Sequence, residues 1–141
     1  MIKDFLTYIK ENQNQNILDV IHEYVITSFW NIKKRNELLN IISKYNFLEE
    51  DKIVNGNYLY RCGDVSIEKI QSYSYKEIGA KKIQNFLRKD YQKNIDIKKI
   101  PITDFEIIVN IPLFIKNNKY WGGKYFQNII NTEYEVLAKK K

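Results

Sequence analysis

The segment Phe105-Glu106-Ile107-Ile108-Val109-Asn110-Ile111 is the clearest strand signal in the chain. Its alternation and its β-branched residues are typical of a strand that buries one face. Pro112 follows at once, and proline lacks the backbone N–H that a sheet ladder needs. We therefore expect Pro112 to end this strand or to lie on a sheet edge.

The chain before about Glu50 is predicted to be helical instead. Apolar residues between positions 17 and 29 recur at the spacing i, i+3, i+4, i+7, which is typical of an amphipathic helix. A second helix is expected from about Leu38 to Asn46, and Lys33 and Lys34 are expected to separate the two. A short amphipathic turn is predicted further upstream, at Phe5, Tyr8 and Ile9.

The second half mixes strands and helix. Besides the segment at 105–111, strands are predicted at Tyr58-Leu59-Tyr60 and from Tyr134 to Ala138, and a helix from Tyr75 to Lys89 with Ser74 as its cap. Helices followed by a strand-rich half predict an α+β fold. We expect a helical segment over 1–50 and an α+β core over 51–141, together forming one compact domain.

Composition excludes several classes of protein. With 141 residues and 17.0 kDa, the chain is long enough for a hydrophobic core without metal or disulfide staples. No apolar run approaches the roughly 18 residues that span a bilayer, and the N-terminus lacks the apolar core of a signal peptide. One cysteine, Cys62, and one histidine, His22, cannot build a zinc site, so no metal is expected. A single cysteine suits the reducing cytoplasm.

Three short motifs contain the candidate catalytic and binding residues, and they follow one another along the chain. They are Leu59-Tyr60-Arg61-Cys62-Gly63, Ser72-Tyr73-Ser74, and Asn131-Thr132-Glu133-Tyr134-Glu135-Val136-Leu137. A guanidinium favours bidentate contact with phosphate oxygens. Side chains at i and i+2 share one face of a strand, which would align the two serines and the two glutamates. Paired carboxylates can divide charge stabilisation from activation of a nucleophile.

In this order the motifs resemble those of the mono-ADP-ribosyltransferases of the arginine–serine–glutamate class, over residues 57–137. The resemblance implies an ADP-ribosyltransferase-like core, NAD as the substrate that donates ADP-ribose, and a protein acceptor with arginine as a candidate side chain. It implies that Glu135 is catalytic and that Glu133 activates the acceptor. NAD would be bound by the residues Arg61, Ser72, Ser74 and Phe86.

A second hypothesis comes from a different class of protein. The segment Tyr120-Trp121-Gly122-Gly123-Lys124-Tyr125-Phe126 is the most aromatic in the chain, and the formal net charge is +6 with a pI near 9.2. If these aromatic residues are exposed, the chain could be a phage- or virus-encoded inhibitor that blocks an acidic or nucleic-acid-binding partner. The enzyme hypothesis likewise suits a small cytoplasmic phage effector that acts on a host protein.

Overall fold

The computed structural model describes residues 17–27 and 31–141. The chain divides into two compact units, residues 1–46 and residues 47–141. Within the described residues, no helix has both the length and the apolar character needed to cross a bilayer.

Two helices make up the described part of the first unit, α2 (Ile17–Ile26) and α3 (Ile32–Ser43). The predicted helices are therefore confirmed, but the predicted break at Lys33 and Lys34 is wrong. The side chain of Asn31 accepts a hydrogen bond from the backbone N–H of Lys34 and starts α3 ahead of both lysines. The predictions at Phe5, Tyr8, Ile9 and Phe29 lie outside the described residues.

Charged side chains join the two helices. The ammonium of Lys34 pairs with the carboxylate of Glu23, and Lys34 is buried. Arg35 donates from Nη1 to the carbonyl oxygens of Tyr24 and Thr27 at 3.2 and 3.0 Å. These contacts satisfy carbonyl groups at the end of α2, which have no partner within the helix.

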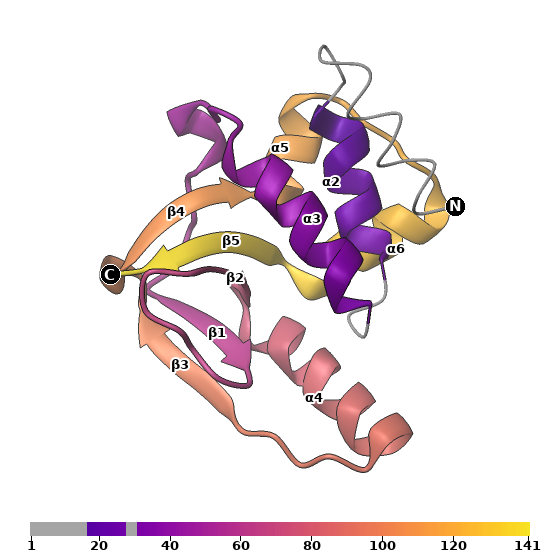
Figure 1. The fold of residues 1–141 in the computed structure, drawn as a ribbon, viewed down its shortest axis with the longest axis vertical. Helices are drawn as coiled ribbons and strands as arrows, with labels where there is room; N and C mark the ends of the chain where they lie inside the picture. The colour runs from indigo at the N-terminus through magenta and orange to yellow at the C-terminus, as the bar shows by residue number, and fades with distance from the viewer. Residues whose placement is uncertain (1–16, 28–30) are drawn as a thin grey trace. The chain divides into compact units, whose positions relative to one another are not determined.

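The second unit contains a five-stranded sheet in the order β3 (Ile97–Pro101), β1 (Tyr58–Cys62), β2 (Ile70–Ser74), β5 (Glu135–Lys140) and β4 (Phe105–Asn110). Every neighbouring pair is antiparallel. Figure 1 shows β1, β2 and β5 side by side in the middle of it. Short 3₁₀ turns lie at Glu49–Asp51 and Ile102–Asp104. The helices of this unit are α4 (Glu77–Tyr91), α5 (Ile111–Asn117) and α6 (Lys124–Glu133).

The predicted mixture of α and β structure with N-terminal helices is confirmed, and so are the predicted strands and the long helix. Strand β4 ends at Asn110, one residue before the predicted end, and Pro112 lies in the first turn of α5. One local prediction is wrong: Lys76, not Ser74, precedes α4 as its N-cap. The sequence analysis did not predict β3, α5 and α6.

The register assigns the strand residues to two faces of the sheet. Directly opposed residues project to the same face. Ser74 lies opposite both Tyr60 and Glu135, and Ser72 lies opposite Leu137. Ser72, Ser74 and Glu135 therefore share one face. The other face carries the hydrophobic cluster Leu59, Tyr73, Phe105, Val136 and Ala138.

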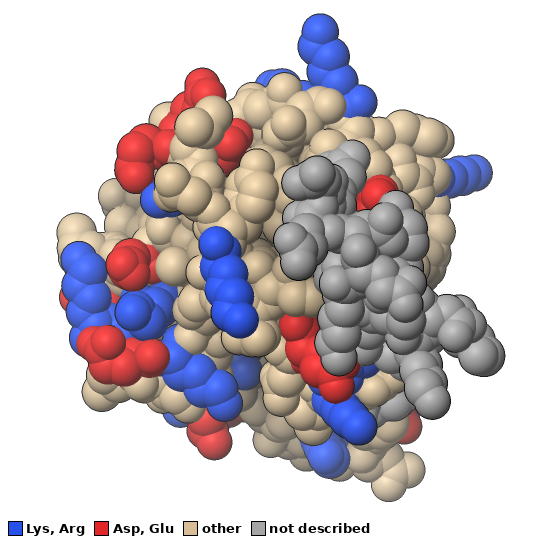
Figure 2. Space-filling view, turned by 45° about the horizontal axis from the view of Figure 1, so that its top comes forward, with Lys and Arg blue, Asp and Glu red and all other residues tan. Residues whose placement is uncertain are grey.

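Charged side chains of both signs are scattered over the face of the molecule shown in Figure 2. In the second unit, the ammonium of Lys139 lies 4.0 Å from the carboxylate of Glu68 and 3.9 Å from that of Glu106. The net charge of +6 therefore does not form a continuous basic stripe on that face.

Replacing Asn110 by alanine should lower the free energy of unfolding by about 1–2 kcal/mol. The buried Asn110 side chain accepts from the backbone N–H of Leu113 at 3.3 Å and donates to the carbonyl of Ile53 at 2.8 Å. It thus caps α5 and holds the segment before β1. Urea denaturation would measure the change. The exposed Asn128 is the matched control, and equal stability losses for the two variants would contradict this role.

Candidate functional site

The three motifs predicted from the sequence lie on adjacent strands. Arg61 is on β1, Ser72 and Ser74 are on β2, and Glu135 begins β5. The Ser72 hydroxyl donates to Oε2 of Glu135 at 2.5 Å. Glu135 is only 7% exposed, whereas Ser72 is half-buried. The fold thus joins two residues that are 63 positions apart in the chain.

Tyr134 places Glu135 at the start of β5. Its backbone is left-handed, with φ 51° and ψ 49°, so α6 ends and the chain turns into the strand. A tyrosine in this region costs roughly 1 kcal/mol. The backbone N–H of Tyr75 donates to the Tyr134 carbonyl at 3.0 Å, and the two rings pack edge to face. These contacts hold the turn that presents Glu135.

The same turn removes Glu133 from the strand. The expectation that Glu133 and Glu135 share a strand face is wrong, because Glu133 is the last residue of α6. Its carboxylate accepts from Nζ of Lys82 at 3.2 Å, and Lys82 also donates to Thr132. The two glutamates therefore differ in setting: Glu135 is buried beside a serine, and Glu133 is paired with a lysine at the surface.

The Ser74 side chain contacts the backbone next to this turn. Its hydroxyl oxygen lies 2.7 Å from the carbonyl oxygen of Glu133 and 2.8 Å from that of Lys76. Gly79 lies against the same atoms. A Cβ on this residue would be 2.1 Å from the Ser74 Oγ and 2.3 Å from the Glu133 carbonyl oxygen. The first turn of α4 can approach the end of α6 this closely because residue 79 has no side chain.

Arg61 is not on the face of Ser72 and Glu135. It shares the face of Leu59, two residues before it, and its guanidinium carbon lies 5.9 Å from the centre of the Tyr73 ring. Nη1 donates to the Ser72 carbonyl at 2.8 Å and Nε to the Asp64 carbonyl at 2.7 Å. Arg61 thus touches the site through the backbone of Ser72.

Phe86 is separated from the serines along α4. It lies two helical turns beyond Gly79, which is about 10 Å along the axis. Its ring packs edge to face on Tyr91 at 5.6 Å between centres. The structure therefore brings Ser72, Ser74 and Glu135 together and leaves Phe86 on the later part of the helix.

Burial changes the titration of groups around these strands. Burial raises the pKa of the Tyr73 hydroxyl above its usual value, and the positive charge of Arg61 partly opposes this. Burial also raises the pKa of Tyr75, helped by Tyr134. These phenols therefore stay protonated at neutral pH and can act as hydrogen-bond donors. The described residues contain no cluster of three or more His, Cys, Asp or Glu side chains that could hold a metal ion.

Three residues of this region were missed by the sequence analysis: Gly79, Lys82 and Tyr134. A glycine in the first turn of a predicted helix was an available signal for Gly79, since glycine disfavours helices by roughly 1 kcal/mol and usually has a packing reason there. No local signal identifies Lys82 or the left-handed Tyr134, because both depend on where α6 ends.

Comparison of the chain with models of protein families, with curated proteins and with solved structures gave no match.

Proposed function

We propose that this chain is a mono-ADP-ribosyltransferase that transfers ADP-ribose from NAD to a side chain of a host protein. One observation carries the proposal: the Ser72 hydroxyl binds the carboxylate of the buried Glu135 across neighbouring strands. Those are the serine and glutamate that the motif resemblance assigns to the NAD site.

The reaction proposed for Glu135 is a substitution at the ribose carbon that carries nicotinamide. The bond between this carbon and nicotinamide breaks, and its electron pair leaves with nicotinamide. The positive charge that develops on the ribose is stabilised by a carboxylate that also accepts a hydrogen bond from a ribose hydroxyl. Ser72 fixes the orientation of that carboxylate. A nucleophile of the acceptor then attacks the same carbon, and its proton passes to the Glu133 carboxylate.

Glu133 is the proposed acceptor-side group. It lies two residues before Glu135 and faces Lys82 rather than Ser72. An arginine acceptor would bring its guanidinium to the carboxylate that Lys82 now neutralises. In this proposal Lys82 holds Glu133 in place until the acceptor arrives.

Arg61 and Ser74 have positioning roles in this proposal, since Arg61 contacts the backbone of Ser72 and Ser74 contacts the backbone of Glu133. Contact of Arg61 and Phe86 with NAD stays a prediction from the resemblance. The interspersed surface charge adds no support to the inhibitor hypothesis, which remains if NAD is neither bound nor consumed.

The test measures nicotinamide release from NAD and labelling of a host lysate by the purified full chain, together with the thermal shift caused by NAD. We expect release, labelling and a positive shift. A chain that shows none of the three is not a transferase.

Replacing Ser72 by alanine should lower nicotinamide release about tenfold, because the Glu135 carboxylate loses the hydroxyl that orients it. The exposed Ser66, whose hydroxyl makes no hydrogen bond among the described residues, is the matched control. Initial rates at saturating NAD would be compared. Equal rates for Ser72→Ala and Ser66→Ala would show that Ser72 does not contribute to nicotinamide release.

A further inference from the structure

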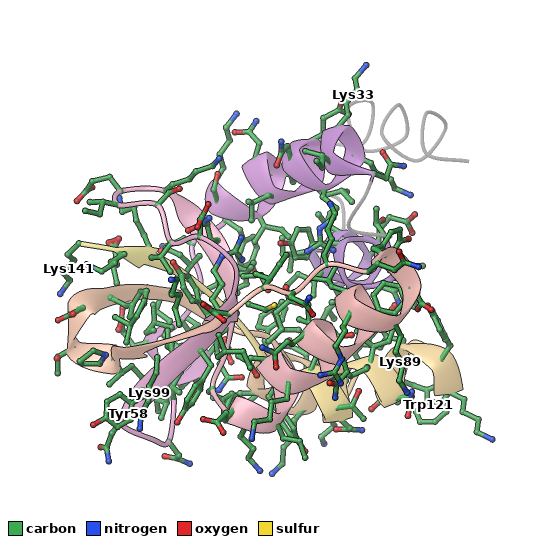
Figure 3. All side chains as sticks on the ribbon, turned by 90° about the horizontal axis from the view of Figure 1, so that it is seen from below. Lys33, Tyr58, Lys89, Lys99, Trp121 and Lys141 are labelled. Atoms are coloured by element: carbon green, nitrogen blue, oxygen red, sulfur yellow. The ribbon has the colours of Figure 1, made fainter. Side chains whose placement is uncertain are left out.

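Two large aromatic side chains project into solvent around the start of α6. Trp121 is 65% exposed and Tyr125 is 69% exposed. Three exposed lysines lie within five residues of Trp121 in the sequence: Lys116, Lys119 and Lys124. We call these five residues the aromatic–lysine surface. Figure 3 shows Trp121 at the periphery, on the other side of the view from Tyr58 and Lys99.

An ordered frame holds this surface in place. The Tyr120 and Phe126 rings pack edge to face with centres 5.5 Å apart, and Phe126 is fully buried. Nε2 of Gln127 donates to the carbonyl oxygens of Tyr120 and Trp121 at 3.2 and 2.6 Å. Trp121 is therefore exposed on a loop whose backbone is hydrogen-bonded to a side chain of α6. A pre-organised surface loses less conformational entropy when it binds a partner.

All charged residues in the sequence around this surface are basic. Between Glu106 and Glu133 the sequence contains no acidic residue, and its cations are Lys116, Lys119 and Lys124. None of the three forms an ion pair with any residue in the described part of the chain. The aromatic–lysine surface is thus complementary to an anionic partner.

We propose that the aromatic–lysine surface binds single-stranded nucleic acid. Bases stack on exposed aromatic rings whatever their sequence, and lysines neutralise the phosphates between them. Trp121 and Tyr125 offer two such rings four residues apart.

Duplex binding fits these observations less well. Stacking requires base faces that are free of a neighbouring base, and these exist in single strands. A duplex groove is matched by a continuous basic face, whereas this surface has only the three lysines. The surface makes no use of Ser72 or Glu135, so this inference stands independently of the proposed NAD chemistry.

The experiment is fluorescence anisotropy of end-labelled oligothymidylate and oligouridylate of about 20 nucleotides, titrated with the full chain at low salt. Trp121→Ala and Tyr125→Ala should each weaken binding about tenfold. Trp121→Phe should retain most of the affinity, since it keeps a stacking face. Joint replacement of the three lysines by glutamine should reduce the dependence of log K on log salt by about 2.

Tyr58→Ala is the matched control, because Tyr58 is a partly exposed tyrosine beside a lysine, with Nζ of Lys99 4.3 Å from its ring centre. It should leave affinity unchanged. The proposal is overturned if neither oligonucleotide binds, or if Trp121→Ala binds as tightly as Tyr58→Ala. It is also overturned in favour of an acidic protein partner if polyglutamate competes as well as oligothymidylate does and depends equally on Trp121.

Discussion

Replacing Glu135 by glutamine is expected to lower the rate of nicotinamide release from NAD at least about 100-fold. The amide is the same size as the carboxylate, and its oxygen can still accept the hydrogen bond that Ser72 donates. It carries no negative charge, however, so it cannot stabilise the positive charge that develops on the ribose. The loss should therefore fall on the chemical step, with NAD binding changed much less.

Glu106 provides the control for this experiment. It is a strand carboxylate at 53% side-chain exposure, on β4 rather than β5. Glu106→Gln should leave nicotinamide release within about twofold of the unchanged chain, a difference of less than 0.5 kcal/mol. Thermal denaturation would confirm that both variants fold. Full activity in a folded Glu135→Gln variant would remove Glu135 from the reaction and with it the proposed mechanism.

Replacing Gly79 by alanine is expected to destabilise the chain by about 3 kcal/mol. Alanine alone would favour the helix by roughly 1 kcal/mol. The new Cβ, however, would lie 2.3 Å from the Glu133 carbonyl oxygen, which is a backbone atom at the end of α6. Relieving the clash requires α4 and α6 to separate and disturbs the Ser74 contact to the same oxygen.

Chemical denaturation would measure this loss. Lys89→Ala, at an exposed position on the same helix, is the control and should change stability by less than about 0.5 kcal/mol. The double variant Ser74→Ala/Gly79→Ala removes the contact at 2.1 Å but keeps the one to Glu133, so it should remain unstable. A Gly79→Ala variant as stable as Lys89→Ala would show that the two helices can move apart freely.

Some elements were predictable because their signals are local. The periodicity of α2 and the alternation before Pro112 each report a face buried by a regular element. Helix α6 was missed although its buried residues Phe126, Ile129 and Ile130 have helical spacing, because the aromatic residues and glycines before it favoured a loop. Strand β3 was missed because Lys98 and Lys99 suit an edge strand and dilute its apolar pattern.

The candidate site, like the fold, was predictable only in part. The resemblance of the sequence motifs to a known family pointed to Ser72, Ser74 and Glu135 as candidate site residues. Only the tertiary structure decided that Ser72 meets Glu135, since this contact depends on the register of β2 against β5. It also decided that Arg61 leaves the sheet on the opposite face, because successive strand residues alternate between faces. The sequence motifs show which polar side chains are present, whereas strand pairing determines which of these side chains can act together.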